Sequence, residues 1–179
     1  MTVVVALRAH DGVWIGADQL QCSGEGKYLQ PCVKWYEDDD WWLAPPGNAA
    51  LGGLLLGEIE RDRSDLTRAW LATLEEAGRR MRAVDMSEND RNGGGRRVVA
   101  VRKSDGEIRI IDAIGFEIVC DAPPWCAVGS GGPGARGALH ALWNLPSSPG
   151  GSAMMHAAIE AAIALDSGCG NGVFVRRVA

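Results

Sequence analysis

The sequence predicts an α+β protein in which two β-sheets pack face to face with a pair of helices outside each sheet, a four-layer αββα sandwich. Segments with strand character come first and are followed by two helical segments, further strands, two more helical segments and a last strand. The first strand, residues 2–9, is apolar on both faces, which is typical of a strand buried between two layers. Nothing divides the chain, and no internal repeat is visible, so we expect a single domain over residues 1–179.

The first two strands are joined by a short turn. Residues 2–9 lead into the turn signal His10-Asp11-Gly12, and residues 13–17 return as the second strand. Residues 19–31 are rich in glycine and glutamine and have no periodicity, so we expect a loop there.

The next segment predicts a hairpin with an acidic tip. Residues 33–36 and 41–44 carry the strand signals, and the run Glu37-Asp38-Asp39-Asp40 separates them. Such a run is typical of a solvated turn, and a docking patch for a partner is the alternative.

Two helices are expected next. Pro45-Pro46-Gly47-Asn48 opens the first, residues 48–60, which contains Gly52, Gly53 and Gly57. Each glycine costs helix stability, about 1 kcal/mol relative to alanine, so we expect close packing against a flat surface to compensate. Residues 65–84 give the strongest helical pattern, with apolar side chains recurring at spacings of three and four.

The second half repeats the order of strands and helices. Its glycine and proline signals predict strands at residues 97–102, 107–112, 116–119, 125–129 and 173–178. Pro133 suits the first position of a helix, and Ser152 is expected to cap a second helix that runs to about Asp166.

Composition excludes several classes of protein. The 179 residues are 46% hydrophobic and 23% charged, which is ordinary for a folded globular protein. The net charge of −5 gives no sign of a basic surface that binds nucleic acid. The longest apolar runs fall far short of the roughly 20 residues that cross a membrane. The five cysteines contain no CxxC pair and no signal peptide is evident, so we expect a reduced, cytoplasmic protein without a metal or other cofactor. The seven tryptophans are expected in the core and in subunit contacts.

The start of the chain carries the first candidate for chemistry. If Met1 is removed, Thr2 has both a hydroxyl and a free α-amine. The ordinary pKa of that amine is about 7.7–8.0, so at neutral pH an appreciable fraction can accept a proton. Nucleophile and general base then lie in one residue. A chain can also begin with Met-Thr by chance, so a catalytic role for Thr2 needs support from other residues of the sequence.

Four further positions match what such a threonine needs. Lys34 interrupts an apolar segment and is the candidate cation beside the hydroxyl, and Asp18 is its candidate partner. Ser130 is placed to orient the amine, and the backbone N–H of Gly47 to stabilise an oxyanion. Each has an ordinary alternative: a structural ion pair for Lys34 and Asp18, a helix cap for Ser130 and a turn glycine for Gly47.

The spacing of these residues resembles that of the proteasome β-subunit family. Asp18, Lys34 and Ser130 follow Thr2 by 16, 32 and 128 residues, and the stretches TVVVALRAHDGVWIGAD, AVGSGGPGARGALHAL and AAIALDSG look like the family's segments. The resemblance spans the full length and is close to the bacterial HslV-type peptidases. Among short stand-alone chains, the sequence looks most like the betaproteobacterial proteasome homologues.

The resemblance implies an Ntn-hydrolase fold and an N-terminal threonine endopeptidase acting on unfolded polypeptide. It further implies a homo-oligomer of two stacked rings, for which we expect seven-fold symmetry, a tetradecamer, with six-fold symmetry as the alternative. A partner ATP-dependent unfoldase is left open. Asp166 matches a family aspartate that braces the serine and the amine, while Gln21, Cys22 and Gly47 are expected to bind substrate.

The chain departs from the family pattern at several positions. Cys169 stands where members often have a serine, which puts that hydrogen bond to Asp166 in doubt. Ala44-Pro45-Pro46 changes the approach to the specificity pocket, and Gly47 lies one residue short of register. The last strand ends the chain, so we expect no tail for docking an unfoldase. A retained Met1 would block the amine. A small-amide hydrolase and a catalytically silent ring protein are the alternative functions.

Overall fold

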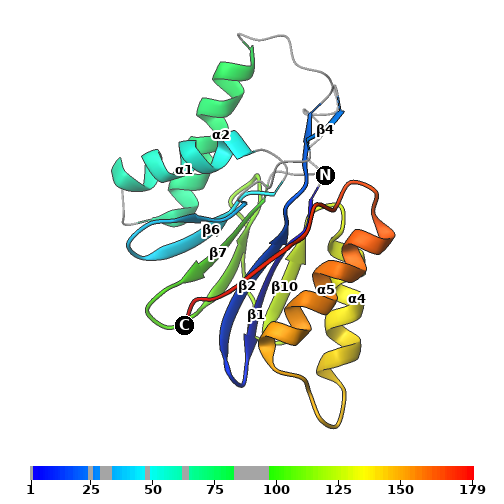
Figure 1. The fold of residues 1–179 in the computed structure, drawn as a ribbon. Coiled ribbons are helices and arrows are strands. Elements are labelled where there is room, and N and C mark those ends of the chain that lie inside the picture. Colours follow the sequence, from blue (N-terminus) through cyan, green and yellow to red (C-terminus); the bar gives the residue numbers. More distant parts are fainter. Residues whose placement is uncertain (1, 24–25, 29–33, 47–48, 62–64, 83–96) are drawn as a thin grey trace.

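Two antiparallel sheets lie face to face in the computed structural model, and a helix pair covers the outside of each (Figure 1). The structure describes residues 2–23, 26–28, 34–46, 49–61, 65–82 and 97–179. The predicted four-layer αββα sandwich is therefore confirmed.

The first sheet has the strand order β10-β1-β2-β11, and helices α4 and α5 cover it. These elements are β1 (Val4–Ala9), β2 (Gly12–Asp18), β10 (Trp125–Val128), β11 (Val173–Arg177), α4 (Gly132–Trp143) and α5 (Gly151–Leu165).

The second sheet has the order β5-β6-β7-β8-β9, and helices α1 and α2 cover it. These elements are β5 (Tyr36–Glu37), β6 (Trp41–Ala44), β7 (Val98–Arg102), β8 (Ile108–Ile111), β9 (Glu117–Val119), α1 (Ala49–Arg61) and α2 (Leu66–Arg82).

Strand β1 lies at the centre of the sandwich and is buried on both faces. Val4 and Ala6 face the second sheet, whereas Val3, Val5 and Leu7 face α4 and α5, and all five are fully buried. Burial of each valine or leucine side chain stabilises the folded state by roughly 1.5–3 kcal/mol. The start of the chain is thereby held rigidly at one end of the sandwich.

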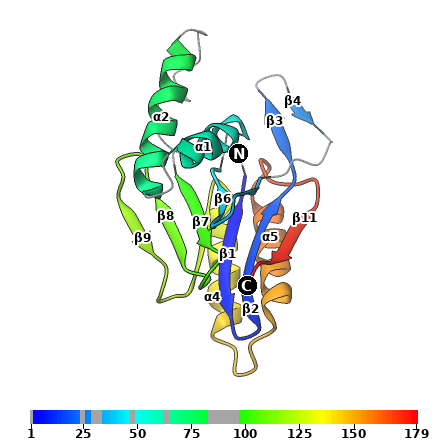
Figure 2. The same cartoon turned by 90° about the vertical axis from the view of Figure 1, so that its left-hand side faces the viewer.

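Two segments differ from the expectation for residues 19–36. Residues 19–31 include a short hairpin, β3 (Gln21–Ser23) and β4 (Gly26–Tyr28), so the prediction of a loop is wrong there. The hairpin rises beyond the ends of both sheets, on the side where the N-terminus lies (Figure 2). Lys34 lies just before β5 and not within a strand, because pairing with β6 begins only at Tyr36.

The N-terminus of α5 is capped by a residue that the sequence pattern did not reveal. The helix begins at Gly151, and both carboxylate oxygens of Asp11, in the β1–β2 turn, accept the N–H of Gly151 at 3.0 and 3.1 Å. Ser152 lies inside the helix, so the prediction that it is the cap is wrong. The turn between β1 and β2 reaches the helix end and supplies a carboxylate in place of the local hydroxyl.

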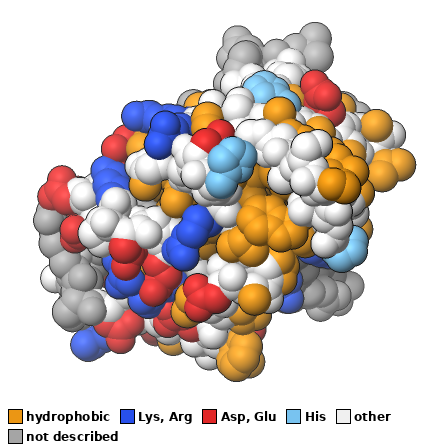
Figure 3. Space-filling model, turned by 90° about the horizontal axis from the view of Figure 1, so that it is seen from below, with side chains coloured by type: hydrophobic (Ala, Val, Ile, Leu, Met, Phe, Trp, Pro, Cys, Tyr) orange, Lys and Arg blue, Asp and Glu red, His pale blue; other side chains and the backbone are white. Residues whose placement is uncertain are grey.

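The surface away from the N-terminus is mixed in character. Seen from below, hydrophobic side chains gather in one region and acidic and basic side chains are interspersed in another (Figure 3). None of the described helices is long and apolar enough to cross a membrane.

The glycines of α1 have different surroundings. A Cβ on Gly52 would lie 2.0 Å from the ring of Tyr36, so the expected close packing is confirmed there. No described atom lies within 4 Å of a Cβ on Gly53 or Gly57, where the expectation is wrong within this chain.

This difference gives a matched pair of substitutions. Gly52→Ala should lower the free energy of unfolding by about 1–3 kcal/mol, because the new methyl group pushes the Tyr36 ring out of place. Gly53→Ala should raise it by about 0.5–1 kcal/mol, because alanine favours the helix and meets no clash. Urea unfolding of both variants checks this, and equal effects would contradict the described packing.

Candidate active site

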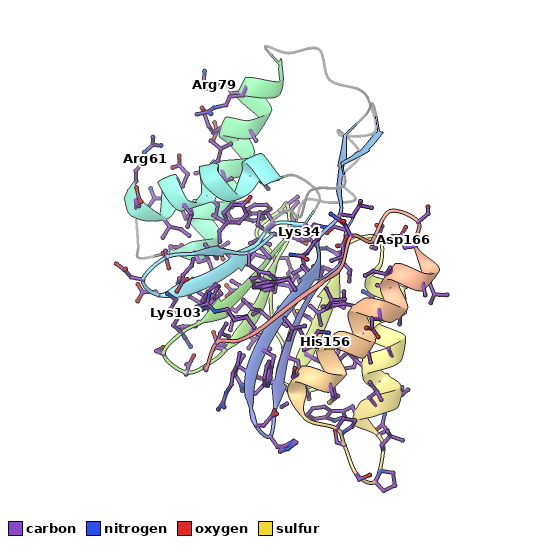
Figure 4. All side chains as sticks on the ribbon, viewed as in Figure 1. Lys34, Arg61, Arg79, Lys103, His156 and Asp166 are labelled. Atoms are coloured by element: carbon purple, nitrogen blue, oxygen red, sulfur yellow. The ribbon has the colours of Figure 1, made fainter. Side chains whose placement is uncertain are left out.

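Five segments far apart in the sequence meet at one end of the sandwich. They are the start of β1, the end of β2, the short segment before β5 that contains Lys34, the turn between β10 and α4, and the turn after α5. Lys34 and Asp166 lie at this end, near the N-terminus, whereas Lys103 and His156 lie farther along the molecule (Figure 4).

The carboxylate of Asp18 is the centre of this cluster. The β1–β2 register pairs Val4 with Ala17, so Asp18 emerges beside the first residues of the chain, where its N–H donates to the Val3 carbonyl. Its side chain is fully buried. Oδ1 accepts the Thr2 hydroxyl at 2.8 Å, the Val3 N–H at 2.8 Å and the Lys34 ammonium at 2.6 Å.

The second oxygen of Asp18 is held by backbone groups. Oδ2 accepts the N–H of Leu20 at 3.3 Å and the N–H of Gly170 at 3.1 Å. Sequence reasoning missed Gly170. The glycine-rich run at residues 167–172 is the signal that the sequence offers, and it indicates a linking segment without a role in the site. This many donors compensate the buried carboxylate for the hydrogen bonds to water that it loses on folding.

The Lys34 side chain is 11% exposed and pairs with the fully buried Asp18. Since the Thr2 hydroxyl contacts the same oxygen, the ammonium and the hydroxyl are immediate neighbours. The structure therefore brings together the predicted nucleophile, cation and counter-ion.

Thr2 is almost wholly enclosed, with 2% of its surface exposed. Its nitrogen lies 3.2 Å from Ser130 Oγ, and its carbonyl accepts the N–H of Gly131 at 3.2 Å. Gly129 has a φ of +95°, and a Cβ there would lie 2.2 Å from the Thr2 carbonyl oxygen. Gly129 must therefore be glycine both for its backbone conformation and for the close approach of Thr2.

Ser130 links Thr2 to Asp166. The N-cap of α4 is Gly131, so Ser130 does not serve as the helix cap. The pKa of Asp166 lies below its ordinary value, because the Ser130 hydroxyl and the N–H of Gly168, at 2.8 Å, stabilise the ionised carboxylate.

Cys169 lies beside this pair. Its thiol donates to Asp166 Oδ2 at 3.6 Å, so the contact that the cysteine put in doubt is present. Burial raises the pKa of this thiol to about 12, and the carboxylates of Asp18 and Asp166 add to the effect. The thiol therefore stays protonated at neutral pH and acts as a donor.

Three predicted positions receive no side-chain description. Gly47 lies outside the described residues. For Gln21 and Cys22 the structure describes the backbone, which belongs to β3, and not the side chains. Their roles remain predictions. Within the described part of the chain, no group of three or more histidine, cysteine or acidic residues is arranged to hold a metal ion.

The contacts of Asp18 predict unequal costs for removing either partner of the ion pair. Asp18→Ala should lower the free energy of unfolding by about 3–5 kcal/mol, because Lys34 and several N–H donors lose their acceptor in a buried place. Lys34→Met should cost less, about 1–2 kcal/mol, because hydroxyl and backbone donors still hold the carboxylate. Urea unfolding measures both, and a larger loss for Lys34→Met would contradict this account.

No protein-family model matches the chain, and no curated protein matches it in sequence. Solved structures match over nearly its whole length. HslV from Trypanosoma brucei is 22% identical with a TM-score of 0.69, covering 97% of each chain. BPH of Thiobacillus denitrificans, solved in complex with epoxomicin, is 20% identical with a TM-score of 0.71, covering 99% of each chain. Anbu from Yersinia bercovieri is 12% identical with a TM-score of 0.67, covering 97% of this chain and 80% of its own. At these identities the likeness shows a shared fold.

Proposed function

We propose that this chain, which has the proteasome-like Ntn-hydrolase fold of HslV and BPH, is the subunit of an N-terminal threonine endopeptidase of that family. The observation that carries the proposal is the shared contact of Thr2 and Lys34 with one oxygen of the buried Asp18, together with Ser130 at the Thr2 nitrogen. These contacts give Thr2 a cation beside its hydroxyl and an orienting hydroxyl at its nitrogen, which is what an N-terminal nucleophile needs.

The reaction begins at the Thr2 hydroxyl. Oγ1 attacks the carbonyl carbon of a peptide bond while the α-amine of the same residue accepts the hydroxyl proton. The ammonium of Lys34 favours the oxygen anion that forms, and Asp18 keeps this ammonium in place. The N–H of Gly47 is expected to stabilise the developing oxyanion.

Collapse of the intermediate breaks the C–N bond. The amine of Thr2 returns its proton to the leaving amine, and an ester forms between Thr2 and the remaining acyl group. A water molecule, deprotonated by the same amine, then hydrolyses the ester and restores the hydroxyl. Ser130 and Asp166 orient the amine through both steps.

This chemistry needs a free Thr2 amine, so Met1 must be removed. The Thr2 nitrogen already faces Ser130 Oγ at 3.2 Å, which is the position that the freed amine would occupy. Removal of Met1 therefore requires no rearrangement of Thr2 to assemble the site.

The proposal also includes the assembly of this subunit into rings. We expect a cytoplasmic homo-oligomer of two stacked rings, seven-fold in preference to six-fold, that cleaves unfolded polypeptide inside its chamber. The likeness to HslV and BPH supports this arrangement at the level of the fold.

Covalent labelling tests the nucleophile. Epoxomicin, an epoxyketone, offers a ketone to the Thr2 hydroxyl and an epoxide to its amine, and nothing leaves when both react. Intact-mass measurement should show the Met1-free chain gaining the whole mass of the probe. Thr2→Ala should gain nothing, and Thr67→Ala, a threonine of α2, should label like the parent chain.

Labelling of Thr2→Ala to the same extent, or of the Met1-free chain not at all, would contradict the proposal. Turnover assays separate the alternatives. Cleavage of an unfolded protein supports the endopeptidase, turnover of small amides alone indicates an amidohydrolase, and turnover of neither indicates a catalytically silent ring protein.

A further inference from the structure

The chain crosses from the second sheet to the first between β9 and β10, and a cysteine lies at each end of this crossing. Cys120 directly follows β9, and its N–H donates to the Ile108 carbonyl of β8 at 2.9 Å, so Cys120 continues the second sheet. Cys126 lies in β10 of the first sheet, opposite Ala6 of β1. Residues 121–125 connect the two cysteines.

Both cysteine side chains face the layer between the sheets. Cys120 is 9% exposed and Cys126 is 4% exposed, and both belong to the apolar cluster that contains Ala6 and Ile108. Trp125 points the other way, into the cluster beneath α4 and α5, because successive side chains of a strand alternate between its faces. The two thiols, which are both free in the structure, therefore face each other from opposite sheets.

The two thiols are in contact and are not equivalent. The Cys126 thiol donates a hydrogen bond to the Cys120 sulfur, and this lowers the pKa of Cys120, although burial and the nearby Asp121 oppose the effect. The same contact, together with burial, raises the pKa of Cys126 well above its ordinary value. Cys120 therefore ionises more readily than Cys126, and the ionised form of cysteine is the one that reacts with peroxide.

We propose that Cys120 and Cys126 form a peroxide-reactive thiol pair that closes to a disulfide joining the two sheets. In a reducing compartment the pair stays as two thiols, and the disulfide forms when peroxide is present. This inference goes beyond the proposed function and does not depend on it, because the pair lies between the sheets and its oxidation does not use the Thr2 amine.

Hydrogen peroxide is the oxidant in this reaction. The Cys120 sulfur attacks one peroxide oxygen and the O–O bond breaks, so that Cys120 becomes a sulfenic acid and the departing hydroxide takes up the Cys120 proton to form water. The Cys126 sulfur then attacks the Cys120 sulfur. The S–S bond forms, the S–O bond breaks, and the departing hydroxide takes the Cys126 proton to form a second water. Two thiols are oxidised to one disulfide while one peroxide is reduced to two waters.

Mapping of the bond tests the pair directly. The folded chain is treated with hydrogen peroxide and unfolded, and its remaining thiols are blocked with N-ethylmaleimide. Trypsin leaves both cysteines within residues 110–136, and chymotrypsin then cuts after Trp125, so only a disulfide keeps the two parts together. We expect linked parts that dithiothreitol separates. Cys169, which is 5% exposed and whose pKa is raised to about 12, should still react with maleimide as a thiol.

Two substitutions separate the roles of the two thiols. In Cys126→Ala, peroxide should leave Cys120 as a sulfenic acid, which the probe dimedone labels, because no second thiol is there to resolve it. In Cys120→Ala, dimedone should label Cys126 several-fold less, because this buried thiol keeps its proton. Equal labelling in the two variants would overturn the assignment of Cys120 as the reactive thiol.

Thermal melting tests whether the bond joins the sheets of the native fold. Peroxide should raise the Tm of the parent chain by roughly 4–8 °C, because a short cross-linked loop restricts the unfolded chain, and dithiothreitol should reverse the rise. Cys126→Ala should show no rise. Absence of the linked parts, oxidation of Cys169 to the same extent, or a disulfide without a rise in Tm would overturn the proposal. The mapping needs no substitution, so it decides the question even where a variant does not fold.

Discussion

The buried carboxylate of Asp18 is the interaction on which the rest of the site depends. Five described groups donate to it: the Thr2 hydroxyl, the Lys34 ammonium and the N–H groups of Val3, Leu20 and Gly170. A charge removed from water at this depth is tolerated only with such compensation. The same contacts join the start of β1, the end of β2, the segment before β5 and the turn after α5, so the stability of the fold and the proposed chemistry depend on one group.

The layers of the sandwich supply the rigidity that this arrangement needs. β1 is buried on both faces, and its register with β2 brings Asp18 back to the first residues of the chain. The β10–α4 turn then approaches Thr2 so closely that a Cβ on Gly129 would meet the Thr2 carbonyl oxygen, and a Cβ on Gly131 would meet Cys169 Sγ. Position in such a site is set by packed backbone more than by flexible side chains.

The sequence predicted the layers from local patterns. It predicted Asp18, Lys34 and Ser130 from local signals together with the family spacing, and Asp166 from the resemblance alone. Apolar character on both faces of residues 2–9 and the position of Lys34 in an apolar segment are visible in a single stretch. The Asp11 cap of α5, the hairpin within residues 19–31 and the contact of Gly170 with Asp18 were missed, because each depends on which distant segments meet. Gly52 and Gly53 are alike in sequence context and differ only in the ring of Tyr36.

In the proposed mechanism, the hydroxyl of Thr2 gains its base only when the amine of the same residue is free. The most direct measurement is the rate of a single acylation by a peptide substrate that releases a fluorophore, in two forms of the chain. One form is released from a removable N-terminal fusion with Thr2 as its first residue, and the other retains Met1. We expect rapid fluorophore release, matched by an acyl adduct on Thr2, in the first form alone. Equal rates in the two forms would contradict it.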